Sequence, residues 1–63
     1  MLKYKVVELG AVTEDTIENA INSQVKDGWN LEGINFAMRD SSKRPSMAFI
    51  LFTMEKNPAD LQN

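Results

Sequence analysis

The chain has 63 residues, of which 43% are apolar and 25% charged, and its formal net charge is -2. This length allows one small domain, and the acidic balance excludes a globally basic nucleic-acid binder. The sequence contains no Cys and no His, which excludes disulfides and thiolate nucleophiles and removes the usual metal ligand and proton shuttle. We therefore expect a protein that is not an enzyme and that holds no metal or cofactor.

Residues 2–9 are predicted to form the first strand. β-Branched and aromatic side chains alternate with lysines in its first half. This alternation places Tyr4 and Val6 on one side of the strand and Lys3 and Lys5 on the other. Gly10 ends the strand.

A helix with one apolar face is predicted over about residues 14–27. Thr13 offers an N-cap oxygen, and Gly28 can take the left-handed conformation that a helix C-cap needs. Trp29 follows at the place where an apolar residue commonly packs back on the last turn. The apolar stripe between the two ends consists of Ile17, Ala20, Ile21 and Val25.

The second strand is predicted over about residues 29–38, and its apolar pattern changes phase at Gly33. Trp29 and Leu31 lie on one phase of the alternation, whereas the later large residues lie on the opposite phase. A β-bulge at Gly33 would shift the period by one step. All the large side chains would then share one face, namely Trp29, Leu31, Ile34, Phe36 and Met38. Without a bulge, the strand carries apolar side chains on both faces.

The last strand is predicted over about residues 47–55 and is apolar on both sides. Residues 39–46, which include Pro45, are typical of a polar hairpin loop, and residues 57–63 of a flexible tail. One alternation set of the strand contains Met47, Phe49 and Leu51, and the other contains Ala48, Ile50, Phe52 and Met54.

Together these elements predict an α+β fold. We expect a single β-α-β-β domain over residues 1–56, with a three-stranded, mainly antiparallel sheet and one helix on one face. Because the richest hydrophobic strand usually lies centrally, we expect the last strand between the other two and antiparallel to both. A sheet in which the first strand lies beside the second and parallel to it stays open from the sequence.

The two-sided last strand indicates a partner. A strand that is apolar on both faces is covered on both faces, and one helix covers only one of them. A core of this size rarely leaves more than roughly 3 to 5 kcal/mol of net stability. We therefore expect a small interaction or scaffold module that pairs with a second copy as a homodimer, or with another protein. The expected interface residues are Met47, Phe49, Leu51, Phe36 and Met38.

The basic residues of the hairpin loop support an alternative function, an accessory nucleic-acid-binding protein. Arg39, Lys43 and Arg44 carry cations that contact phosphates in such proteins. We favour a solvated turn, because the loop holds no aromatic residue for base stacking and the chain is acidic. Nucleic acid is therefore not the expected partner.

The acidic residues near the helix start need no metal. Glu14, Asp15 and Glu18 carry the oxygen ligands that Mg²⁺ prefers. The helix dipole also favours carboxylates at this end, and it explains them without a bound ion.

Three segments follow one another in a characteristic order along the chain. They are Tyr4-Lys5-Val6-Val7, Asp27-Gly28-Trp29-Asn30-Leu31 and Phe49-Ile50-Leu51-Phe52. Together they resemble a small bacterial family, the domain of unknown function 4177, whose members show a YKVV strand, a helix ending in EGWEL, a hairpin and a closing apolar strand. The resemblance covers residues 3–56 and implies the β-α-β-β fold but no activity. This chain differs in Asp27, in Asn30 and in its longer polar loop.

The sequence shows no signal peptide and no membrane-spanning segment. The first residues lack an apolar run of signal length, and nowhere do 18 consecutive apolar residues occur. We therefore expect a cytoplasmic protein that does not contact a membrane.

Overall fold

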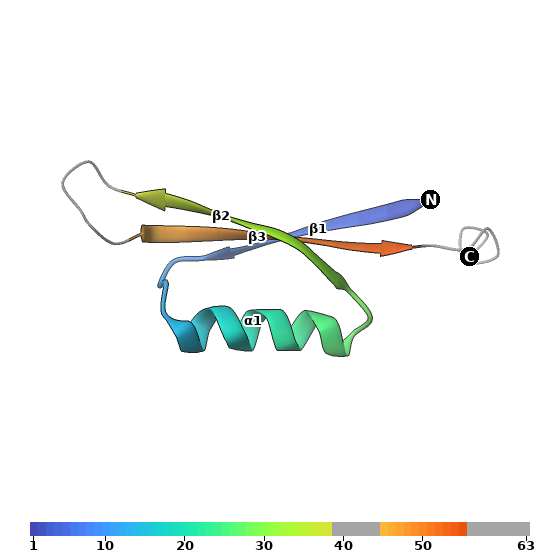
Figure 1. Cartoon of the computed structure of the whole chain (residues 1–63), viewed down its shortest axis with the longest axis horizontal. Coiled ribbons are helices and arrows are strands. Elements are labelled where there is room, and N and C mark those ends of the chain that lie inside the picture. The colour runs from blue at the N-terminus through green and yellow to red at the C-terminus, as the bar shows by residue number, and fades with distance from the viewer. Residues whose placement is uncertain (39–44, 56–63) are drawn as a thin grey trace.

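The computed structural model describes residues 1–38 and 45–55. They form β1 (Leu2–Leu9), α1 (Glu14–Lys26), β2 (Asn30–Met38) and β3 (Pro45–Glu55). The sheet order is β1-β3-β2, and β3 is antiparallel to both neighbours. Figure 1 shows α1 on one side of this sheet. The α+β fold and the central last strand are thus confirmed, and the alternative with β1 beside β2 is wrong.

Helix α1 begins at the predicted N-cap. The Thr13 hydroxyl accepts a hydrogen bond from the Thr16 backbone N–H at 3.1 Å, and the Thr16 hydroxyl accepts one from the Thr13 N–H at 2.9 Å. This reciprocal capping box satisfies N–H groups that a helix start would otherwise leave unpaired. Glu14 and Asp15 occupy the first turn, where the helix dipole favours negative charge.

The helix ends one residue earlier than predicted, with Asp27 as its C-cap. Gly28 follows in the left-handed region with a φ of +97°. The Gly28 N–H donates to the Val25 carbonyl and the Trp29 N–H to the Gln24 carbonyl, each at 3.0 Å. These two bonds form a Schellman motif, which confirms the predicted role of Gly28.

The apolar stripe of α1 is rotated from its predicted position. Val25 is 50% exposed, whereas Gln24 is half-buried beside Ile17 and Ile21. Neighbouring helix positions lie about 100° apart, so a small rotation exchanges the two side chains at the edge of the stripe. Among the described residues, the buried Oε1 atom of Gln24 has no hydrogen-bond partner. The prediction of Val25 as a stripe residue is therefore wrong.

Strand β2 contains the predicted bulge, one position earlier than expected. Leu31 pairs with Phe52 and Gly33 with Leu51, so that Glu32 is the extra residue. The strand begins at Asn30 instead of Trp29, because the Trp29 N–H bonds to the helix end. The shift has the expected consequence for Leu31, Ile34 and Phe36, because all three lie opposite the buried set of β3. It does not extend to Trp29, which precedes the strand, or to Met38, which follows a second register shift.

Strand β3 begins two residues earlier than predicted. Pro45 and Ser46 belong to the strand instead of the hairpin loop, and Pro45 pairs with Met38. A proline is tolerated at the first position of a strand, where its missing N–H interrupts no ladder. A second register shift lies here, and the Ser46 hydroxyl donates to the Ala37 carbonyl at 3.2 Å.

The core of the described chain lies between α1 and β3. Its fully buried apolar residues are Ala48, Ile50 and Phe52, all of which belong to one alternation set of β3. The helix covers this set. The other set alternates with it along β3 and therefore lies on the opposite face of the sheet.

Replacing Gly28 with alanine tests the helix end. A side chain at a φ of +97° is strained, and we expect Gly28→Ala to lower the free energy of unfolding by about 1 to 2 kcal/mol. Urea denaturation measures this change. Gly10→Ala is the control, because an added Cβ meets nothing within 4 Å there, and its effect should stay within about 0.5 kcal/mol. Equal stability of both variants would contradict the assigned role of Gly28.

Replacing Gln24 with methionine tests the unpaired acceptor. Gln24→Met keeps the length of the side chain and removes a buried polar atom that lacks a partner. We expect the free energy of unfolding to rise by about 1 kcal/mol. Asn22→Met, at an exposed position of the same helix, should add only a few tenths of a kcal/mol from helix propensity. A destabilised Gln24→Met variant would show that the amide is paired.

Candidate functional site

The sheet face opposite α1 carries a group of large apolar side chains. In antiparallel pairs, directly opposed residues share a face, and Val6 opposes Leu51 while Val7 opposes the buried Ile50. Every second residue counted from Val6 on β1, and from Leu51 on β3, therefore lies on the same face as Val6. We call this surface the open face and define it by Leu2, Tyr4, Val6, Met47, Phe49 and Leu51.

The open face is exposed on β1 and partly covered on β3. Tyr4 is 65% and Val6 is 62% exposed, whereas the β3 residues are half-buried. Strand β2 adds only small or polar residues here, with Gly33 opposite Leu51 and Asn35 opposite Phe49. In Figure 1, no helix or strand of the described chain lies over this side of the sheet.

The structure separates the predicted interface residues. Met47, Phe49 and Leu51 lie on the open face. Phe36 opposes Ala48 on the helix side, and Met38 pairs with Pro45 beyond a register shift. Both are about half exposed, at 51% and 53%. The five predicted interface residues therefore do not form one continuous surface.

Sequence reasoning left the β1 residues out of the interface. Leu2, Tyr4 and Val6 complete the open face because each lies beside the outward set of β3. The alternation of residues 2–9 already placed Tyr4 and Val6 together. Only the register of β1 on β3 shows which set of β3 residues they accompany.

Carboxylates border the open face. The Thr53 hydroxyl, on a side chain that is 5% exposed, donates to Glu32 Oε1 at 2.7 Å. Glu55 forms an ion pair of 3.0 Å with the Met1 amine, next to the pairing of Leu2 with Glu55. Glu8 lies opposite Phe49. Two of these carboxylates are thus engaged by their own chain, which leaves the apolar residues as the main contact surface.

The described part of the chain offers no enclosed site. Residues 1–38 and 45–55 contain no enclosed pocket and no group of acidic side chains that could hold a metal ion. Arg39, Lys43 and Arg44 lie outside the described residues. In the part of the chain that is described, no helix is long and apolar enough to cross a membrane.

Comparison with known proteins finds no family model, curated protein or solved structure that matches the chain. The resemblance to the domain of unknown function 4177 family stays a prediction.

Proposed function

We propose that the protein is a small, non-enzymatic interaction module that self-associates through the open face. The observation that carries this proposal is an apolar sheet face without a covering element among residues 1–38 and 45–55. Helix α1 lies on the other side of the sheet (Figure 1), where Ala48, Ile50 and Phe52 are buried. Contiguous exposed apolar surfaces of this kind mark interaction sites in small proteins. A bacterial setting belongs to the same proposal and is supported by the family resemblance alone. The expected cytoplasmic setting is part of the proposal too.

A single copy leaves apolar side chains of the open face exposed to water. Fully burying a large apolar side chain contributes about 1.5 to 3 kcal/mol. Tyr4 and Val6 remain more than half exposed, so most of that gain is missing from the single chain. A second copy placed on the open face supplies it.

A two-fold dimer suits this surface, because both copies would use the same residues. Sheets that pack face to face lie about 10 Å apart with strands aligned to within about 30°. Because β1 has 8 residues, the three strands span a flat area of roughly 27 by 14 Å, or about 400 Å² per copy. This is below the area of a standard stable interface. We therefore expect a reversible dimer that forms at micromolar or higher concentration.

Substitution of Val6 tests the open face. The molar mass of the unmodified protein, measured by light scattering during gel filtration, should rise from one chain towards two as concentration increases. Val6→Glu places a charge in the interface beside Leu51, and we expect it to keep the mass of one chain. Val6→Thr retains a β-branched side chain and should weaken the dimer without preventing folding.

A substitution on α1 is the control for the substitution of Val6. Val25→Glu changes a valine of similar exposure on α1, away from the open face, and should dimerise like the unmodified protein. A mass of one chain at every concentration, with no binding of an apolar dye, would mean that residues of the same chain cover the face. That result would overturn the proposal, as would equal dimerisation of Val6→Glu and the unmodified protein.

A further inference from the structure

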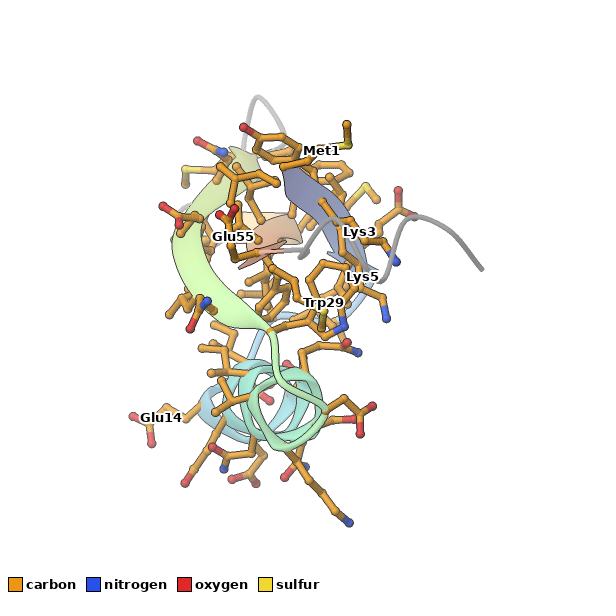
Figure 2. All side chains as sticks on the ribbon, turned by 90° about the vertical axis from the view of Figure 1, so that its right-hand side faces the viewer. Met1, Lys3, Lys5, Glu14, Trp29 and Glu55 are labelled. Atoms are coloured by element: carbon orange, nitrogen blue, oxygen red, sulfur yellow. The ribbon has the colours of Figure 1, made fainter. Side chains whose placement is uncertain are left out.

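A second cluster lies on the other side of β1. The Nζ atom of Lys5 lies 5.2 Å, and that of Lys3 5.7 Å, from the ring centroid of Trp29. Figure 2 shows the two lysines side by side on β1 next to Trp29, where the chain enters β2. Both distances are within the range of cation–π attraction, and the Trp29 side chain is half-buried.

Neither lysine forms an ion pair with a carboxylate among residues 1–38 and 45–55. In the described part of the chain, the ion pair found is that of Met1 with Glu55, and neither lysine takes part in it. The aliphatic parts of the Lys3 and Lys5 side chains can pack on the Trp29 ring, as long charged side chains commonly do on apolar surfaces. Such packing does not neutralise the ammonium groups. This arrangement places two like charges close to one aromatic ring in a protein whose net charge is -2. This local concentration of cations favours an anionic ligand.

The shape of the surface narrows the class of ligand. Small molecules are usually enclosed in concave pockets, and the described residues form none. Single-stranded nucleic acids instead lie on open surfaces, with bases stacked on aromatic rings and phosphates beside cations. Lys3 and Lys5 are two residues apart on one strand, which separates them by about 6.6 Å along β1.

From this arrangement we propose that Trp29, Lys3 and Lys5 form a binding site for single-stranded nucleic acid. Lys3 and Lys5 each contact a backbone phosphate along β1. When the ammonium groups turn to the phosphates, they uncover the ring of Trp29 for stacking with one base. This site differs from the predicted basic loop, because it uses none of Arg39, Lys43 or Arg44.

The site is independent of the proposed self-association. Lys3 and Lys5 alternate with Tyr4 and Val6 along β1, so the two surfaces lie on opposite faces of the same strand. A dimer formed through the open face leaves Trp29 accessible. Loss of dimerisation and loss of nucleic-acid binding are therefore separable results.

Binding is measured with a fluorescein-labelled oligothymidine of about twelve nucleotides, by anisotropy, on the full chain at low salt. Trp29 is the only Trp, so its fluorescence should be quenched as the base stacks. Two phosphate contacts predict that the logarithm of the binding constant falls with the logarithm of salt concentration with a slope of about -1.4. In the double variant Lys3→Gln, Lys5→Gln we expect this slope to approach zero.

Two variants of Trp29 separate stacking from folding. Trp29→Leu should weaken binding about tenfold, whereas Trp29→Phe keeps an aromatic surface and should retain most of it. Circular dichroism establishes that each variant is folded. If Trp29→Leu does not fold, the comparison of Trp29→Phe with the double lysine variant still decides the matter, because the proposal requires binding by the first and a reduced salt slope in the second.

The loop variant Arg39→Gln, Lys43→Gln, Arg44→Gln is the matched control and should bind like the unmodified protein. Three results would overturn the proposal. They are the absence of binding at low salt, binding that the loop variant loses and the double lysine variant keeps, and equal affinity for thymidine monophosphate and the oligonucleotide. The last result would indicate a small-molecule site instead of an extended strand.

Discussion

The structure depends on one constraint: a single helix covers only one face of a sheet whose central strand is apolar on both. The fully buried apolar residues Ala48, Ile50 and Phe52 all come from the covered set of β3. The opposite set remains half-buried between β1 and β2. In a chain of 63 residues without Cys, no disulfide adds to the stability that this burial gives. The open face is therefore an unused source of apolar burial in the described chain.

The bulge at Glu32 determines what each face contains. It places Leu31 and Ile34 on the helix side despite their opposite phases in the sequence. It also brings the Glu32 carboxylate to Thr53, which closes one end of the open face with a polar contact. The apolar surface is consequently built by β1 and β3, while β2 contributes little to it. The two faces of β1 therefore carry different side chains, with apolar residues on the open face and lysines beside Trp29 on the other.

Local signals predicted most of the fold. The Thr13 cap, the left-handed Gly28 and the central β3 each follow from residue type and short-range spacing. The remaining features depend on tertiary contacts. Whether Gln24 or Val25 faces the sheet depends on a helix rotation that periodicity does not resolve, and the separation of Phe36 from the open face depends on the register with β3. The approach of Lys3 and Lys5 to Trp29 joins residues far apart in sequence, so spacing alone gave no indication of it.

The most direct test of the open face as an interface is the thermal unfolding midpoint as a function of protein concentration. Association that stabilises the folded chain makes this midpoint depend on concentration. If a second copy covers the open face, a hundredfold increase across the micromolar range should raise the midpoint by several degrees, since about 1 kcal/mol shifts it by about 4 to 8 °C in a domain of this size. A midpoint that is the same at every concentration would contradict stabilisation by self-association.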